Sequence, residues 1–428
     1  MSRLASLLIC SLVCLGACHD KHGAAPNTDA GPDAPPPPSD GGEGIEPPGI
    51  GLVVVNSDFV STSISLLDRT TGQVTNGNCI NSATRPPGNT LALSGDVVLP
   101  SQPQPGNLIL ALDRTNSALT WIDPSTCTPL RQLDVSTGFF SNPHDVIAVS
   151  PTKAYVLRYE RNETPTPDPN DHDEGDDLLI IDPSVPAITG RIDLSSYAVQ
   201  VTGTNIQARP DRGLQINGKL FVVLSNLSAD FQVGGNGRLL VIDPATDRVT
   251  DMIDLPEFKN CTGLTYAERT KILSTACSGV FGEGAAAMVA ASGIAYVDTS
   301  ASPPAEVRHQ SAALFGGRAV ADFSGIALGG TLGFGITFGE FSGKPKDQLW
   351  AVDVIAGTAT KLADSSDSFT FGNVLVDRTQ EHVYLTDANA AEPRVQIYGY
   401  ASGVAPMHLT SVNANPAVGL PPRQIAWY

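Results

Sequence analysis

One short pattern recurs through most of this chain: an apolar strand that ends in Asp, then a few polar residues, then a second alternating strand. It is clearest in "NGRLLVIDPATDRVTDMIDL", residues 236–255, and returns in "NSALTWIDPSTCTPLRQLDV" and "GDDLLIIDPSVPAITGRIDL". The Asp that ends the apolar strand recurs every 55 to 61 residues, at Asp68, Asp123, Asp182, Asp243, Asp298 and Asp353. A seventh, degenerate copy is "RVQIYGYASG", residues 394–403.

This period decides the fold class. A repeat of roughly 50 residues with about four short strands per unit is typical of a β-propeller. The Asp-Pro pair supplies a tight turn, because Asp accepts hydrogen bonds at the first turn position and Pro presets the second. Residues 51–428 therefore predict an all-β domain, a seven-bladed β-propeller of four-stranded antiparallel blades.

A second element precedes most units. The segments 85–94, 142–150, 208–217 and 371–377 each begin at or near Pro or Gly and continue as a short strand, which we expect to be the innermost strand of a blade. The last copy, "LPPRQIAWY" at 420–428, has nothing after it, whereas the first unit has no such strand before it. The C-terminal strand is therefore expected to complete the first blade and close the ring, which removes an open sheet edge.

The units resemble the YVTN-type repeats of bacterial surface propellers, and "VIDPATDRVTDMIDL" is the best match. The resemblance covers the whole domain and implies its fold. It rests on turn chemistry and strand pattern, so it implies almost nothing about activity.

The N-terminus, "MSRLASLLICSLVCLGAC", has one Arg and then an apolar run too short to span a membrane as a helix. Residues 1–17 read as a lipoprotein signal peptide, since Leu15-Gly16-Ala17-Cys18 resembles the bacterial lipobox and would make Cys18 the lipidated residue. The alternative is ordinary cleavage that leaves Cys18 as an idle thiol. By the same resemblance, His19 favours an outer-membrane address, on either its periplasmic or its surface side.

Residues 18–50 are rich in Pro, Gly and Asp and hold almost no large apolar side chains. Such a segment cannot bury enough surface to offset its ordering entropy. We expect a disordered tether that holds the propeller away from the membrane.

The propeller segment carries −14 of the net charge of −18, and half of that −14 comes from one loop. Segment 160–177, "ERNETPTPDPNDHDEGDD", has eight acids against Arg161. An acidic protein is a poor partner for nucleic acid, so none is expected.

If the strands of a blade are lettered A to D from the axis outward, antiparallel order places B–C loops and D–A crossovers on one face of the ring. The long connections are of these two kinds, at 160–177, 195–210, 226–237, 278–292 and 339–347. Residues 95–106 fit neither kind. Loops that lengthen on one side of a rigid scaffold predict a binding face there.

Polar residues at the heads of the inner strands are candidates for a ligand site at the channel mouth. Several Arg with one His could hold an anionic or sugar-like ligand by charge-assisted hydrogen bonds. Alternatively, these side chains pair with one another and with crossover backbone. The candidates are Arg85, His144, Asp145, Arg209, Asp211, Arg212 and Arg423.

The acidic run is oxygen-rich, as calcium requires, but it lacks EF-hand spacing, so a solvated loop is the competing interpretation. The candidate calcium ligands are Asp168, Asn170, Asp171, Asp173, Asp176 and Asp177. His144 and His172 do not make a zinc cluster, and no other cofactor is indicated.

Four cysteines lie in the propeller segment. An even number in an exported protein suggests disulfides. Cys261 and Cys277 stand at opposite ends of an A–B hairpin, within bridging distance, and Cys79 with Cys127 follows by elimination.

Two functions remain open. No Gly-x-Ser-x-Gly elbow, phosphate loop or haem motif is present in the sequence, which favours a lipid-anchored scaffold that binds a protein, glycan or other envelope ligand. The alternative is a propeller enzyme, such as a lactonase or metal-assisted hydrolase, working from the channel mouth.

Overall fold

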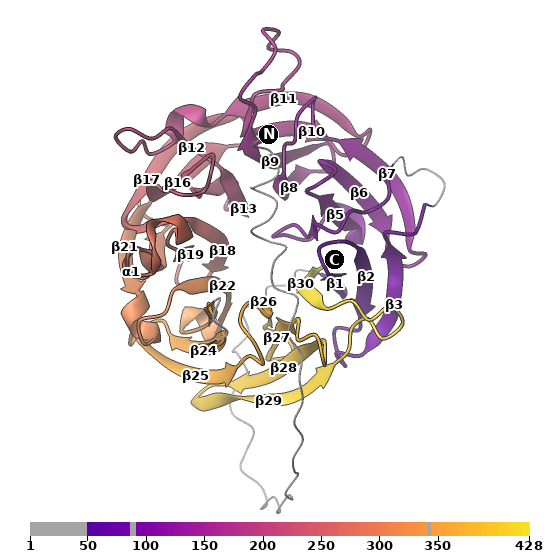
Figure 1. Cartoon of the computed structure of the whole chain (residues 1–428), viewed down its shortest axis with the longest axis vertical. Helices are drawn as coiled ribbons and strands as arrows, with labels where there is room; N and C mark the ends of the chain where they lie inside the picture. The colour runs from indigo at the N-terminus through magenta and orange to yellow at the C-terminus, as the bar shows by residue number, and fades with distance from the viewer. Residues whose placement is uncertain (1–48, 86–90, 341–343) are drawn as a thin grey trace, which may run out of the picture.

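A computed structural model describes residues 49–85, 91–340 and 344–428. They form seven four-stranded antiparallel sheets arranged as blades around a central axis (Figure 1). The predicted all-β, seven-bladed propeller is confirmed. The signal segment, Cys18 and the tether up to residue 48 lie outside the described residues. The described part contains no helix of the length and apolarity that a membrane crossing requires.

Each blade is written here from its inner strand A to its outer strand D. The first three blades are β30 (Pro422–Trp427), β1 (Leu52–Ser57), β2 (Thr62–Leu67) and β3 (Val74–Asn81); β4 (Val97–Val98), β5 (Ile109–Asp113), β6 (Ala118–Asp123) and β7 (Thr128–Asp134); and β8 (Pro143–Ser150), β9 (Lys153–Arg161), β10 (Gly175–Asp182) and β11 (Ala187–Asp193).

The other four blades follow in chain order. They are β13 (Pro210–Ile216), β14 (Lys219–Leu224), β16 (Asn236–Asp243) and β17 (Arg248–Lys259); β18 (Cys261–Ala267), β19 (Ile272–Ser278), β20 (Ser292–Asp298) and β21 (Ala305–Ser311); β22 (Val320–Ala327), β23 (Leu332–Thr337), β24 (Gln348–Asp353) and β25 (Thr358–Asp364); and β26 (Phe371–Asp377), β27 (His382–Asp387), β28 (Arg394–Ala401) and β29 (Val404–Val412).

The remaining elements lie in the connections. A two-stranded ribbon pairs the short strands of the blade 3–4 crossover and the blade 4 B–C loop. The strands of this ribbon are β12 (Ile206–Gln207) and β15 (Leu227–Ser228). The other elements in the connections are the helix α1 (Ala285–Ala290) and the 3-10 turns η1 (Pro105–Asn107), η2 (Ser195–Tyr197), η3 (Phe281–Glu283), η4 (Ala312–Phe315) and η5 (Leu328–Gly330).

The recurring Asp folds the C–D turn in blades 1 to 6. In blade 3, the Asp182 carboxylate accepts hydrogen bonds from the backbone N–H of Ser184 at 2.8 Å and from its hydroxyl at 2.6 Å. In blade 4, Asp243 accepts from the N–H of Ala245 at 3.1 Å. These side chains are committed to their own turns, as the pattern predicts.

The core lies between blades rather than within them. Seven clusters of buried apolar side chains in the described residues each join two neighbouring sheets. Leu157 of blade 3 packs in one cluster with Leu240 of blade 4, for example. Each blade therefore depends on both of its neighbours for burial.

The C-terminal strand closes the ring, as expected. β30 pairs antiparallel with β1, with Trp427 opposite Leu52 and Ile425 opposite Val54. Ile425 also packs in the cluster that joins blade 1 to blade 7, together with Tyr384. One blade is thus built from both ends of the described chain.

The inner strand of blade 2 differs from the expectation. Segment 85–94 was expected to supply it, but that strand is β4, only two residues long. The chain after β4 then crosses toward blades 3 and 4 along the axis. The N–H of Ser101 donates to the Asp145 carboxylate at 2.8 Å, and the N–H of Gln215 donates to the Gln102 side chain at 3.2 Å. We call residues 99–104 the axial strap.

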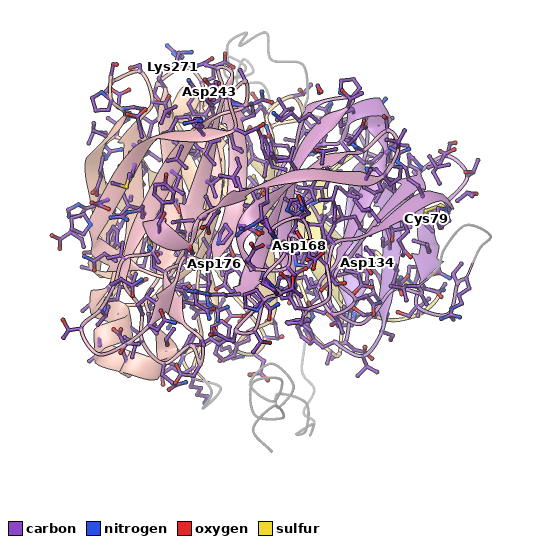
Figure 2. All side chains as sticks on the ribbon, turned by 90° about the horizontal axis from the view of Figure 1, so that it is seen from above. Cys79, Asp134, Asp168, Asp176, Asp243 and Lys271 are labelled. Atoms are coloured by element: carbon purple, nitrogen blue, oxygen red, sulfur yellow. A yellow bond between two sulfur atoms is a disulfide. The ribbon has the colours of Figure 1, made fainter. Side chains whose placement is uncertain are left out.

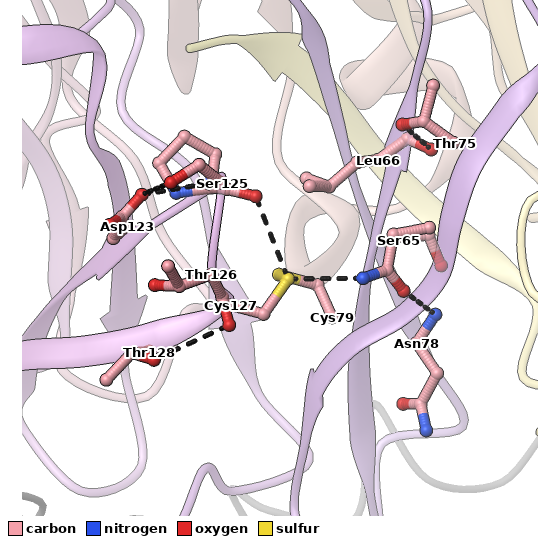
Figure 3. Close-up of a disulfide and its surroundings, with 12 residues drawn as sticks. Ser65, Leu66, Thr75, Asn78, Cys79, Asp123, Ser125, Thr126, Cys127 and Thr128 are labelled. Carbon is pink, nitrogen blue, oxygen red and sulfur yellow. Dashed lines mark hydrogen bonds between the residues drawn. A yellow bond between two sulfur atoms is a disulfide. The ribbon is translucent and has the colours of Figure 1, made fainter.

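Both expected disulfides are present. Cys79 of β3 is bonded to Cys127 in the β6–β7 turn, which links blade 1 to blade 2 across a Cα–Cα distance of 5.1 Å (Figure 3). Cys261 and Cys277 face each other in the β18–β19 pair. The first bond therefore joins two blades, and the second lies within one.

The ring has two unlike faces. The turn face carries the A–B and C–D turns; Lys271 and Asp243 lie together there, at one edge of the ring in Figure 2. The loop face carries the B–C loops and D–A crossovers. Asp168 of a B–C loop and Asp176 at the start of β10 lie away from the turn edge in the same view. The expected placement of the long connections on one face is confirmed.

Candidate ligand-binding face

Contacts between blades tie the long loops of the loop face together. The ribbon β12–β15 joins a crossover to a B–C loop. Glu283 in the blade 5 loop accepts hydrogen bonds from the N–H of Gly234 at 3.0 Å and from Lys259 at 2.8 Å, both in blade 4. These contacts hold the loops as one preorganised surface.

Aromatic side chains gather on this face. Within the described residues, the exposed aromatic side chains are Phe59, Phe140 and Phe281, at 44%, 53% and 45% exposure. All three lie in B–C loops or D–A crossovers. A row of ring contacts runs from Phe281 to Phe338 at 5.4 Å and on to Phe369 at 5.9 Å, over blades 5, 6 and 7. Aromatic residues are enriched at binding surfaces.

The inner strands are linked side by side near their loop-face ends. At the third position of four inner strands, an acid or amide bonds to the backbone of the neighbouring inner strand or, for Gln424, to that of Leu99 in the axial strap. Asp145 accepts from the N–H of Gly213 at 2.9 Å, and Gln424 accepts from the N–H of Leu99 at 2.7 Å. We call Asp145, Asp322, Asn373 and Gln424 the polar girdle.

The side chains of His144 and Asp211 are in hydrogen-bond contact across blades 3 and 4. His144 Nδ1 lies 2.8 Å from Asp211 Oδ2, and the His144 ring stacks on Tyr159 with centroids 3.9 Å apart. Both residues lie at β-bulges, which turn side chains out of the regular alternation. The two side chains keep 13% and 10% of their surface exposed.

The electrostatics of this pair favour a neutral His beside an ionised Asp. Burial lowers the pKa of His144, and this outweighs the opposing effect of Asp211. Burial alone would raise the pKa of Asp211, but the hydrogen bond from His144 and the charge of Arg212 hold it below its usual value. A neutral ring that donates from Nδ1 to Asp211 presents Nε2 as an acceptor.

Arg212 and Asp322 lie near the pair. Arg212 Nη1 donates to the backbone oxygens of His144 at 2.8 Å and of Leu99, in the axial strap, at 3.0 Å. Asp322 Oδ2 accepts from the N–H of Val374 at 3.2 Å and from the Ser324 hydroxyl. Burial raises the pKa of Asp322, and the charge of Arg212 opposes that rise.

The other predicted mouth residues do not join this group. Arg85 is exposed beyond the outer strand β3. Arg209 is fully buried, 2.9 Å from Glu160 and packed against Phe231. Arg423 donates to the Ser57 carbonyl at 3.0 Å. Arg209, Arg423 and Asp145 therefore agree with the alternative in which these side chains pair with one another or with backbone.

The six candidate calcium ligands divide between two environments. Asp168, Asn170 and Asp171 are exposed and bond within the loop. The other three are buried in separate networks: Asp173 accepts from the N–H of Thr166, Asp176 from those of Ala208 and Arg209, and Asp177 pairs with Arg158 and Arg191. In the described residues, no group of three or more His, Cys, Asp or Glu side chains has an arrangement that could hold a metal ion.

Two residues of this region were missed from sequence, Tyr159 and Asp322. The signal for Asp322 was available, since aligning the inner-strand heads "PHDV", "VADF", "FGNV" and "PRQI" places an acid or amide third in each. Tyr159 lies within strand β9 between Arg158 and Glu160, and no repeated pattern marks it.

Comparison with known proteins supports the fold alone. No protein-family profile and no curated protein sequence matches this chain. Among solved structures, the periplasmic gluconolactonase of Pseudomonas aeruginosa matches with a TM-score of 0.56 and 10% identity, over 88% of this chain and 98% of its own. A proposed 6-phosphogluconolactonase of Bacteroides uniformis matches at 0.54 and 13%, over 88% and 99%. A Lactobacillus plantarum protein matches at 0.55 and 12%, over 88% and 98%.

Proposed function

We propose that this protein is an exported, lipid-anchored binding module, held at the outer membrane through Cys18, that presents its loop face to a protein or glycan of the cell envelope. One observation carries the proposal: every exposed aromatic side chain of the described residues lies on that face. The turn face instead carries Asp side chains that fold back into their own turns.

The place where the chain enters the propeller supports the same orientation. Arg69, in a C–D turn, donates to the Gly49 carbonyl at 3.4 Å, and the N–H of Ile50 donates to the carbonyl of Tyr428 at 2.7 Å. Residues 49–51 therefore lie at the turn face. A tether attached there leaves the loop face directed away from its point of attachment.

Capture of envelope components tests the binding proposal. The domain carrying Phe140→Ser and Phe281→Ser should retain envelope partners at least about tenfold less well than the unchanged domain, because buried aromatic anchors dominate interfaces. The matched control carries Val185→Ser and Ile355→Ser, which are 64% and 62% exposed in turns of the other face. Equal capture by both double variants would contradict a loop-face site.

The anchor has its own test. Replacement Cys18→Ala should release the full chain from membranes into the soluble fraction, because a lipid at that residue is the proposed attachment. A Cys10→Ala form is the control and should remain with membranes. If Cys18→Ala still sediments with them, the lipid assignment is wrong.

A second candidate function is hydrolysis at the ring axis, and the His144–Asp211 pair favours it. A neutral His held by a carboxylate is the usual arrangement of a general base with its orienting group. The unchanged protein should then hydrolyse some member of a lactone and ester panel, and His144→Gln should lower kcat by at least about 100-fold. Absence of turnover with and without calcium would exclude this candidate.

A further inference from the structure

We infer that the loop-side ends of β8, β13 and β22 form a binding site for a small carboxylate that carries a neighbouring hydrogen-bond donor. Three polar groups from blades 3, 4 and 6 cluster around Asp211: its Oδ2 lies 2.8 Å from His144 Nδ1, its Oδ1 lies 3.8 Å from Arg212 Nε, and Gly263 lies beside both Asp211 and Asp322. The atoms that would face the ligand are His144 Nε2, Arg212 Nη2 and Asp322 Oδ1, because Nδ1, Nη1 and Oδ2 on the opposite side of each group are bonded within the protein.

The space between the two carboxylates is left open by a glycine. Against the raising effect of burial, the N–H of Gly263 helps to lower the pKa of Asp211, and a Cβ at Gly263 would lie 3.7 Å from Asp322 Oδ1. Gly263 also has a φ of +68°, which other residues rarely adopt. The backbone of blade 5 therefore passes between Asp211 and Asp322 without placing a side chain there.

The polar groups are held rigidly. Arg212 is fixed by two backbone oxygens, one of which belongs to Leu99 of the axial strap. His144 is fixed by Asp211 on its edge and by Tyr159 on its face. Asp322 is fixed by Ser324 and the Val374 N–H. Groups that are already ordered lose little entropy when a ligand binds.

The chemistry of the three atoms specifies the ligand. Arg212 is the cation of the cluster and would bind a carboxylate. The neutral His144 Nε2 and Asp322 Oδ1 are acceptors, so they require donors on the ligand beside that carboxylate. The carboxylates of Asp211 and Asp322 disfavour ligands with several negative charges. A hydroxy acid or an amino acid meets these requirements.

Four probes of similar size separate the parts of this inference. Glycerate and serine combine a carboxylate with donors, propionate offers the carboxylate alone, and glycerol offers hydroxyls alone. Binding to the full chain, measured by calorimetry and ligand-observed NMR, should be at least tenfold tighter for glycerate or serine than for propionate or glycerol. The tighter of the first two identifies a hydroxyl or an ammonium as the donor. Equal binding of all four, or of none, would overturn the inference.

Variants locate the site. Asp322→Asn keeps an oxygen acceptor for Ser324 and Val374 and should weaken binding of the preferred probe at least tenfold. Arg212→Gln should do the same, and Arg248→Gln, an exposed cation at the start of β17, is the control that should change nothing. Unchanged affinity in Asp322→Asn would contradict the site even if Arg212→Gln fails to fold. The Phe140→Ser, Phe281→Ser double variant should retain probe binding, which separates this site from the loop-face proposal.

Discussion

Among single residues, Asp176 of blade 3 bonds to the backbone of the crossover that leads to blade 4. It is fully buried, and its carboxylate accepts the N–H groups of Ala208 at 2.8 Å and Arg209 at 2.6 Å. Burial nevertheless raises the pKa of Asp176 to about 6. A residue first considered as a calcium ligand therefore fastens a crossover instead.

Replacement Asp176→Asn should change how stability depends on pH. A carboxyl whose pKa is raised by folding contributes stability below its unfolded pKa of about 4, and this contribution is lost as pH rises through the folded value of about 6. Asn does not ionise, so the unfolding free energy of the unchanged protein should fall relative to Asp176→Asn by up to about 3 kcal/mol between pH 4 and pH 7. Urea unfolding across that range measures it.

The exposed Asp168→Asn is the control for this experiment, and its stability should run parallel to that of the unchanged protein. If the difference in unfolding free energy between the unchanged protein and Asp176→Asn also stays constant with pH, the pKa of Asp176 is not raised by folding.

Removing Arg158 should be far more costly than removing a surface cation. Arg158 and Asp177 are fully buried and bonded through two contacts of 2.8 and 2.6 Å. In Arg158→Ala the carboxylate keeps Arg191, at 2.8 Å, so we expect a loss of about 3 kcal/mol, at the low end for a broken buried pair. Lys361→Ala breaks an exposed pair with Asp364 and should cost less than about 1 kcal/mol. Equal losses in urea unfolding would refute this.

For single residues, the sequence predicted which residues stand at the heads of inner strands better than it predicted where their side chains lie. His144 and Asp211 were expected at the axis and lie there, whereas Arg209 is buried and Arg423 bonds to Ser57. The reason is local register. A bulge in the β1–β30 pair shifts the register at Arg423, and Arg209 has a positive φ of 51° just before β13. A shift of one residue reverses the face on which a side chain lies.

At the scale of elements, strands that carry the repeated sequence pattern were predicted, and short segments without that pattern were not. Strands that end in the recurring Asp were identified because apolar alternation and turn chemistry agree there. β4 was missed because two residues carry no alternation, and the axial strap was missed because its bonds go to distant partners such as Asp145 and Gln215. Contacts of that kind depend on the closed ring and are absent from any local pattern.

The disulfide that joins two blades should contribute more than the one within a hairpin. Cys79 and Cys127 are 48 residues apart, and Cys261 and Cys277 are 16 apart. Chain-entropy arguments assign about 4 kcal/mol to the first loop and about 3 kcal/mol to the second. The double variant Cys79→Ser, Cys127→Ser should therefore unfold at lower urea than Cys261→Ser, Cys277→Ser. If the Cys261→Ser, Cys277→Ser variant unfolds at the lower urea concentration instead, the Cys79–Cys127 bond does not contribute more stability than the Cys261–Cys277 bond.

At the scale of the whole molecule, every blade is stabilised by its neighbours. The seven clusters between blades form a closed cycle, and the polar girdle strengthens its inner side. Cutting the cycle anywhere exposes two blade faces at once. The repeat made this closure predictable from sequence. The first unit lacks an inner strand, and the strand at residues 422–427 has no unit of its own, so the two complete one blade.

Deleting residues 422–428 tests that closure. The deletion removes the partner of β1, the Gln424 bonds to Leu99, and the Asn373 bonds to Ile425 that join blade 7 to blade 1. It also removes Ile425, whose burial alone is worth about 2 kcal/mol. We expect the melting temperature to fall by roughly 10 °C and the transition to broaden, because several kcal/mol are lost and the cycle is open. Calorimetry measures both. Deleting residues 1–48 is the control and should leave the transition unchanged, whereas a C-terminal deletion that melts as late and as sharply as the full chain would show that the ring is not closed by β30.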